Sequence, residues 1–431
     1  MQTPFFHIEI PTQAQDHKIL ANILPGADSL AVSEIAAQFN GLTVVVTNDT
    51  RSAVRLEKEL AQLSPLNVTF FPDWETLPYD SFSPHQDIIS ARLSALFHLQ
   101  QRKQGIFILP IATLMQRVCP PSYLQHRVLL INKGDRFVIE TLRLQLEKSG
   151  YRAVEQVLEH GEYAVRGALL DLFPMGSAVP FRLDFFDDEI DSIRTFDVDT
   201  QRTLQEIDQI NLLPAHEFPT DNQGIEFFRS QFRAAFGEIR RDPEHIYQQI
   251  SKGTLAAGIE YWQPLFFEDM ATLFDYFPAN TLFITGEQNQ TQGERFYADA
   301  EQRFESRRVD PMRPLLSPDK LWLRIDEVNR QLKNYPAIAL KTEKVRSSAR
   351  QKNLAITPLP PLTIQSQQKE PLHQLRQFIE HFKGNILFIV ETEGRRETLL
   401  SLLAPLKLKP KQISSLAQAT EEKLALMVSP L

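Results

Sequence analysis

Residues 161–197 restrict the fold more than any other part of this chain, because they have the pattern of paired β-strands. Two stretches in which apolar and polar side chains alternate flank a turn-rich break at residues 173–180, as in strands joined across a turn. Successive side chains point to opposite faces of a strand, so Phe181, Leu183 and Phe185 are expected to face a core. The run therefore predicts a β-sheet module.

The opposite face of the second stretch would carry Arg182, Asp184 and Phe186. Arginine and aromatic side chains are the types that most often anchor protein–protein interfaces, and Arg166 in the first stretch would extend the same patch. This patch predicts a docking surface for another protein. The alternative is that a neighbouring helix buries Phe186 while Arg182 pairs locally with Asp184.

The chain has 431 residues, a length that favours about three domains. Its hydrophobic content of 42% and charged content of 23% are typical of soluble globular proteins. No apolar run in the sequence approaches the roughly 20 residues that span a bilayer. The net charge of −8 lacks the basic footprint of a nucleic-acid-binding protein, although a local basic groove stays open. With a single cysteine, which precludes an internal disulfide, we expect a cytoplasmic protein without a membrane partner.

Strand–helix alternation over residues 1–125 predicts an α/β domain with a parallel sheet. Residues 126–213 hold mostly short alternating strands, which predicts an α+β unit with an antiparallel sheet. Residues 214–345 return to a mixed pattern, residues 346–369 are the expected linker, and residues 370–431 begin another α/β unit. Strands are expected at 42–46, 68–71, 106–109, 265–267, 282–285, 337–341, 386–390 and 423–428, and helices at 50–63, 88–101, 140–149, 225–235, 243–251, 372–382 and 395–403.

The loop that would cradle phosphate in the first domain holds Gly26, Ala27, Asp28 and Ser29. A phosphate loop needs a second glycine and a lysine, which let backbone N–H groups and a cation meet the phosphates. Neither follows Gly26, and Asp28 and Glu34 would repel phosphate. Ser29 or Asp28 remains a plausible helix cap. We therefore expect a degenerate loop that binds no nucleotide cofactor, and a chain without catalytic activity of its own.

Two other residue patterns suggest different functions. Asp184, Asp187 and Asp188 follow a strand, and carboxylates so placed would hold a divalent metal for hydrolysis. The favoured interpretation is that Asp187 and Asp188 form a hairpin turn, because Asp is common in turns. The aromatic-rich segment at residues 71–82 would stack the bases of single-stranded DNA, yet its charges are acidic, which favours rings packed on the sheet. Cys119 is interpreted as a packing residue, and no metal site is expected.

Several segments resemble the N-terminal part of bacterial transcription-repair coupling factors. They include FPDWETLPYDSFSPHQDIISARLSAL (71–96), HGEYAVRGALLDLFPMGS (160–177) and RLDFFDDEIDSIRTFDVDTQRTL (182–204). The chain is also similar to the B subunit of the excision nuclease (UvrB), which carries a V-R-G…F-P…F-F-x-D-E-I pattern. The resemblance implies a vestigial RecA-like or helicase-like domain formed by residues 1–125 and 214–345. An inserted docking domain at 126–213 would split it, and a truncated third α/β domain would follow.

The resemblance also implies a function. The inserted domain would bind the excinuclease A subunit (UvrA) through Arg166, Arg182 and Phe186, and so bring nucleotide excision repair to RNA polymerase stalled at DNA lesions. The ATP- and Mg-dependent DNA translocase, and the contacts with RNA polymerase and double-stranded DNA, would lie in domains absent from this chain. Two departures from the B subunit, the degenerate loop and the missing aromatic hairpin, imply a recruitment module that neither hydrolyses ATP nor verifies lesions.

Overall fold

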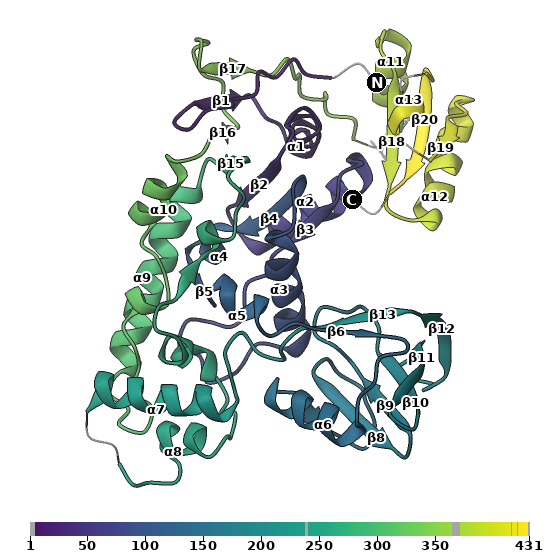
Figure 1. The fold of residues 1–431 in the computed structure, drawn as a ribbon. Helices are drawn as coiled ribbons and strands as arrows, with labels where there is room; N and C mark the ends of the chain where they lie inside the picture. Colours follow the sequence, from purple (N-terminus) through teal and green to yellow (C-terminus); the bar gives the residue numbers. More distant parts are fainter. Residues whose placement is uncertain (1–4, 238–239, 364–370, 415, 420, 430–431) are drawn as a thin grey trace.

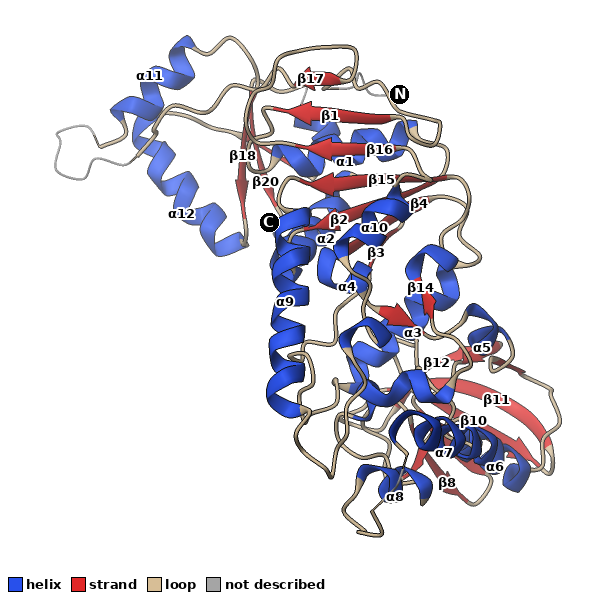
Figure 2. Ribbon diagram, turned by 90° about the vertical axis from the view of Figure 1, so that its left-hand side faces the viewer, coloured by secondary structure: helices blue, strands red, loops and turns tan. Residues whose placement is uncertain are grey.

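The computed structural model describes residues 5–237, 240–363, 371–414, 416–419 and 421–429. A seven-stranded sheet runs through the upper part of the molecule as drawn in Figures 1 and 2, in the order β17-β1-β16-β15-β2-β4-β3. All six strand pairings in it are parallel. Its strands are β1 (His17–Ala21), β2 (Leu42–Thr47), β3 (Val68–Phe70), β4 (Gly105–Pro110), β15 (Thr281–Gly286), β16 (Ala337–Leu340) and β17 (Gln351–Asn353).

Helices cover both faces of this sheet, which explains why β2 and β4 are continuous apolar runs that are buried along their whole length. Val45 of β2 packs in one core cluster with α1 (Ala27–Gln38) and α2 (Thr50–Leu63). Val44 and Val46, which point the other way, belong to a second cluster. That cluster also includes residues of α3 (Gln86–Leu99), α4 (Ile111–Met115), α9 (Asn289–Arg307) and α10 (Ile325–Leu332).

The sheet is assembled from two separate stretches of chain. Strands β1–β4 lie within residues 17–110 and β15–β17 within 281–353, and β1 pairs with both β16 and β17. The chain forms its other large sheet between the two stretches. The α/β class and the parallel sheet are thus confirmed, whereas the domain boundaries at 125, 213 and 345 stay predictions. The expected linker at 346–369 contains β17, so its first part is wrong, and residues 364–369 lie outside the described residues.

The second sheet has the order β12-β11-β10-β9-β8-β7 and forms the unit at the lower right of Figure 1. Its pairings are antiparallel except for the short parallel pair β7–β8. One face packs with Leu142 and Leu146 of α6 (Ile139–Lys148) in a common core. The strands are β7 (Arg152–Ala153), β8 (Glu162–Arg166), β9 (Leu169–Leu172), β10 (Phe181–Phe186), β11 (Glu189–Phe196) and β12 (Thr203–Ile207), with the ribbon β6 (Leu129–Asn132) and β13 (Gln209–Leu212) alongside.

The described residues between 371 and 429 include a small parallel sheet in the order β18-β20-β19, shown in yellow in Figure 1. It consists of β18 (Ile386–Val390), β19 (Lys411–Ile413) and β20 (Leu424–Val428), with α11 (His373–His381), α12 (Glu393–Leu403), η4 (Ala404–Leu406) and α13 (Leu416–Ala419). The strands expected at 386–390 and 423–428 are confirmed, as is the helix over 395–403, which begins two residues earlier.

The remaining elements connect the two large sheets. They are α5 (Pro121–Gln125), α7 (Asn222–Phe236), α8 (Ile246–Ser251), the two-stranded pair β5 (Arg117–Val118) and β14 (Ala271–Thr272), and the 3-10 helices η1 (Ile259–Phe266), η2 (Leu273–Asp275) and η3 (Pro318–Lys320). The strand expected at 265–267 is wrong, because that run ends η1. Gly258 opens η1 with φ +72°, a left-handed conformation that suits glycine.

Candidate functional site

A cleft of about 480 Å³ lies at the carboxyl ends of β1, β2, β15 and β16. Open α/β sheets bind ligands at this edge, and the expected phosphate loop forms part of the wall. Helix α1 begins at Ala27 with Gly26 at its N-cap, and no side chain caps it. The expected cap by Asp28 or Ser29 is therefore wrong. The Ser29 hydroxyl instead donates a hydrogen bond to the Gly26 carbonyl oxygen, 3.0 Å away.

Two cations line this cleft, Arg55 and Lys341, and two acids already bind Arg55. Its Nη1 donates to Oε2 of Glu59 at 2.9 Å, and its Nη2 forms an ion pair with Asp28. The hydrogen bond to Asp28 is the main cause that raises the pKa of Arg55. The cleft is lined by three acids, Asp28, Glu59 and Glu287, and by two bases, so its lining carries a net negative charge, which opposes the approach of phosphate.

Three of the four aromatic rings in the segment at 71–82 pack inward, as its acidic charges favoured. Phe71, Trp74 and Tyr79 are buried. Tyr79 packs against the Tyr261 ring with centroids 5.5 Å apart, and Trp74 meets the same ring edge-on at 5.7 Å. These three enclosed rings are not available to stack nucleobases. Phe82 is the remaining ring of the segment and is 69% exposed, and one ring among acidic side chains gives little support to the DNA-binding alternative.

The structure assigns structural roles to two of the three acids, Asp184 and Asp187, while the Asp188 side chain is exposed. Asp184 pairs with Arg194 at 3.0 Å, and Asp187 lies in the turn between β10 and β11 with φ +55°, which Asp tolerates. In the described part of the chain, no group of three or more His, Cys, Asp or Glu side chains is arranged to hold a metal ion. Cys119 is buried as expected, and burial raises the pKa of its thiol to about 12. The geometry therefore gives no support to the hydrolase alternative.

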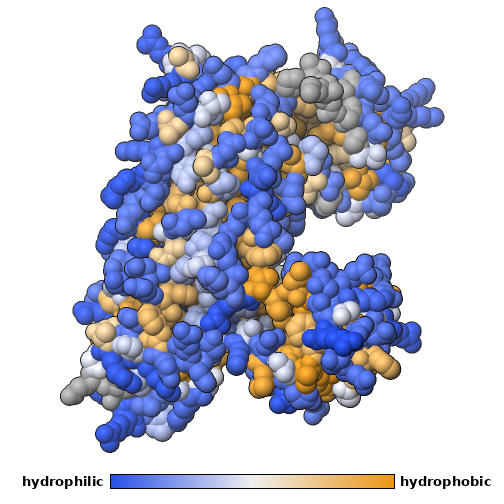
Figure 3. All heavy atoms as spheres, in the orientation of Figure 1, coloured by the Kyte–Doolittle hydropathy of each residue, from blue (hydrophilic) through white to orange (hydrophobic). Residues whose placement is uncertain are grey.

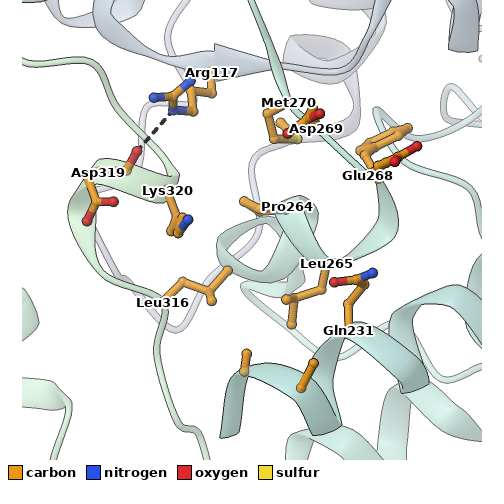
Figure 4. Close-up of a pocket in the computed structure, with 13 residues that line it drawn as sticks. Arg117, Gln231, Pro264, Leu265, Glu268, Asp269, Met270, Leu316, Asp319 and Lys320 are labelled. Carbon is orange, nitrogen blue, oxygen red and sulfur yellow. Dashed lines mark hydrogen bonds between the residues drawn. The ribbon is translucent and has the colours of Figure 1, made fainter.

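Another cavity, of about 530 Å³, lies between α7, η1 and η3 (Figure 4). Leu265 and Leu316 line the side opposite Arg117 and Glu268 in this view. Arg117 Nε donates to the carbonyl oxygen of Asp319 at 3.0 Å. Both positive and negative side chains surround the cavity, so it favours neither anionic nor cationic ligands.

The outer face of the six-stranded sheet, which points away from α6, carries the residues predicted for docking. Along β10, Phe181, Leu183 and Phe185 are buried, as the alternating pattern predicted. Phe186 at the end of the strand has 76% of its surface exposed. The alternative in which a helix buries Phe186 is therefore wrong.

Strand register brings the two predicted arginines together. Arg182 on β10 lies directly opposite Asp171 on β9, and Arg166 lies at the end of the adjacent strand β8, opposite Leu169. A tight hairpin at Gly167, with φ +61°, joins β8 to β9. Residues that are directly opposite, or two apart along a strand, share a face of the sheet. Arg166, Asp171 and Arg182 therefore project from one face.

Asp171 binds both arginines. Its carboxylate accepts two hydrogen bonds from Arg182, Nε to Oδ1 at 2.7 Å and Nη2 to Oδ2 at 2.9 Å. Arg166 Nη2 donates to the same Oδ2 at 2.7 Å. Asp184 pairs with Arg194 instead, so the local pairing of Arg182 with Asp184 is also wrong. The hydrogen bonds to Asp171 are the main cause that raises the pKa of Arg182.

A small apolar cluster covers the other end of this face. It consists of Val157, Ala164, Phe173 and Phe196. The guanidinium of Arg182 lies over the Phe196 ring, with its Cζ 5.1 Å from the ring centroid. The outer face thus has a closed end that holds Arg182 and an open end that exposes Arg166 and Phe186.

Comparison with known protein families identifies two segments of the chain. A model described as the UvrB interaction domain matches residues 129–218, and one described as the MFD D3 domain matches residues 378–431. The transcription-repair-coupling factor of Haemophilus influenzae is 77% identical over 431 residues, all of this chain and 38% of the relative. This chain belongs to the transcription-repair-coupling factor family.

Other members are more distant. The transcription-repair-coupling factor of Escherichia coli is 55% identical over 424 residues, which are 98% of this chain and 37% of the relative. That of Bacillus subtilis is 26% identical over 284 residues, or 63% of this chain and 24% of the relative. The chain thus spans less than two fifths of the length of these coupling factors.

The segment matched by the UvrB interaction domain includes Arg166, Asp171, Arg182 and Phe186. Sequence reasoning found three of these four residues and missed Asp171. The sequence did contain a signal for Asp171, because it is an acid within the apolar stretch LLDL. Aligning the two strands across the break at 173–180 places it opposite Arg182. Figure 3 shows that hydrophobic residues also gather on this unit where it adjoins the rest of the chain. No helix among the described residues is long and apolar enough to cross a membrane.

Proposed function

We propose that this chain is a non-catalytic recruitment module that binds the excinuclease A subunit through the outer face of the six-stranded sheet. In this role it brings nucleotide excision repair to RNA polymerase stalled at DNA lesions. The observation that carries the proposal is the projection of Arg166, Arg182 and Phe186 from one face of the segment that matches the UvrB interaction domain.

The chemistry of the face supports a protein partner. Phe186 offers a large apolar side chain with little contact to its own fold, and Arg166 is 52% exposed on its side chain. An aromatic anchor beside an arginine is the composition of interface hot spots. The local acidity around Asp28 and Arg55 supports the absence of nucleotide chemistry. We further propose that ATP-driven translocation, and the contacts with RNA polymerase and double-stranded DNA, belong to the parts of the coupling factors that this chain does not span.

Binding of the purified A subunit to immobilised chain tests the proposal. Phe186→Ala and Arg166→Ala should each weaken binding by about tenfold or more, the effect of losing an interface anchor. Phe82→Ala and Arg308→Ala are matched controls, because Phe82 is also an exposed phenylalanine and Arg308 also an exposed arginine with one acidic partner. Both controls should bind like wild type. Unchanged binding by Phe186→Ala, or equal losses in the controls, would contradict the assignment.

A further inference from the structure

We propose that Asp171 is a positioning residue, which holds the guanidinium groups of Arg166 and Arg182 side by side for partner binding. This inference rests on the proposed function and adds a residue that touches no partner itself. Asp171 is only 1% exposed, so a docking protein cannot reach its carboxylate. It lies on β9, the strand between those that carry the two arginines.

Both oxygens of the carboxylate are used. Oδ1 accepts from Arg182 Nε, and Oδ2 accepts from Arg182 Nη2 and from Arg166 Nη2. The contact with Arg182 is therefore bidentate, the geometry that fixes a guanidinium most firmly. Two cations converge on one buried anion, so without Asp171 they would repel each other at close range.

The contacts divide the roles of the two arginines. Arg182 also donates from Nη1 to the Gln201 carbonyl oxygen at 3.4 Å and lies over Phe196, and only 17% of its side chain is exposed. Among the described residues, the side chain of Arg166 has one hydrogen-bond partner, Asp171, which it contacts through Nη2. A guanidinium has five N–H donors, so four donors of Arg166 remain for a partner.

This arrangement specifies the chemistry of the partner surface. Two arginines share the single negative charge of Asp171, so one positive charge remains. Arg166 would therefore bind hydrogen-bond acceptors on the partner, best supplied by a carboxylate. Phe186 would enter an apolar recess beside it. Arg182 would contribute mainly by keeping Asp171, and through it Arg166, in place.

A double-mutant cycle tests the role of Asp171. Asp171→Asn keeps the shape of the side chain and one acceptor oxygen but removes the charge that two arginines share. We expect the variant to bind the A subunit at least tenfold more weakly than wild type. In the Arg166→Ala background the same change should cost less than threefold, because most of its effect acts through Arg166. A general loss of structure would instead weaken binding equally in both backgrounds.

Asp184→Asn is the matched control, since Asp184 pairs with Arg194 on the same face and holds neither docking arginine. It should bind like wild type. If Asp171→Asn fails to fold, Arg182→Lys removes the bidentate contact while it keeps the charge, and it should give the same non-additive loss with Arg166→Ala. Wild-type chain that fails to bind the A subunit would defeat the proposed function itself. Two outcomes would overturn only the positioning role while the wild-type chain binds the A subunit. In one, Asp171→Asn binds like wild type; in the other, Asp171→Asn weakens binding by the same factor with and without Arg166→Ala.

Discussion

Replacing Glu260 with glutamine should stabilise the chain at pH 8 by about 3 kcal/mol and leave its stability near pH 4 almost unchanged. Glu260 lies in η1 with 7% of its surface exposed, and its Oε2 accepts a hydrogen bond from the Ser83 hydroxyl at 2.8 Å. Burial, followed by smaller effects that include the nearby charge of Glu217, raises the pKa of Glu260 to about 7.

The sign and size follow from proton linkage. Between the ordinary pKa of 4.5 and about 7, folded chain keeps the Glu260 proton that unfolded chain has released. Stability therefore falls as pH rises through this range. The difference between a pKa of 4.5 and one of about 7 corresponds to about 3 kcal/mol of unfolding free energy. Glutamine resembles the neutral acid at every pH and escapes this penalty, so the variant gains its advantage between pH 4.5 and 7 and keeps it above.

Urea unfolding followed by tryptophan fluorescence from pH 4.5 to 8.5 measures the difference. The three tryptophans report on the surroundings of Glu260, because Trp74 and Trp322 contact the ring of Tyr261, and Trp262 follows it. Glu268→Gln, at an exposed position nearby, is the matched control and should change stability far less than Glu260→Gln. Stability curves of Glu260→Gln and wild type that stay parallel over the whole pH range would refute the reasoning.

Further predictions concern the core, the docking face and the cleft. Arg92→Met should cost about 3–5 kcal/mol in urea unfolding, because it leaves the buried carboxylate of Glu217 without its partner. A smaller loss for Arg92→Met combined with Glu217→Gln checks this cause. Phe185→Ala should lower stability by about 3–5 kcal/mol, whereas Phe186→Ala should leave the melting temperature unchanged, and equal effects would mean that the faces of β10 are misassigned. Calorimetry with MgATP should give no binding heat, and saturable binding would contradict our view of the degenerate loop.

The sequence predicted elements well where local patterns decide them. Helix α2 has the predicted bounds, since its apolar spacing is regular and Asp49 caps it by accepting from the Ser52 amide at 2.7 Å. The buried strands β2 and β4 were evident as short apolar runs between turn signals. The alternation within β10 likewise placed Phe186 on the exposed face.

Features that depend on distant parts of the chain were missed. The pattern at 265–267 predicts a strand but lies at the end of η1, because a short apolar run fits a strand or a buried helical turn equally well. Strand β17 lies in a segment of linker composition and exists through pairing with β1, far back in the sequence. The role of Asp171 depends on how β8, β9 and β10 align, which no single stretch of residues specifies.

The interleaved order of the parallel sheet has a consequence for biosynthesis. His17 pairs with Ala337, so β1 leaves the ribosome hundreds of residues before the strand with which it pairs. At about 5–20 residues per second this delay is on the order of tens of seconds. The antiparallel unit, whose strands are all close in sequence, can mature during that interval. The outer face of the six-stranded sheet would then be complete before β15, β16 and β17 have joined the parallel sheet.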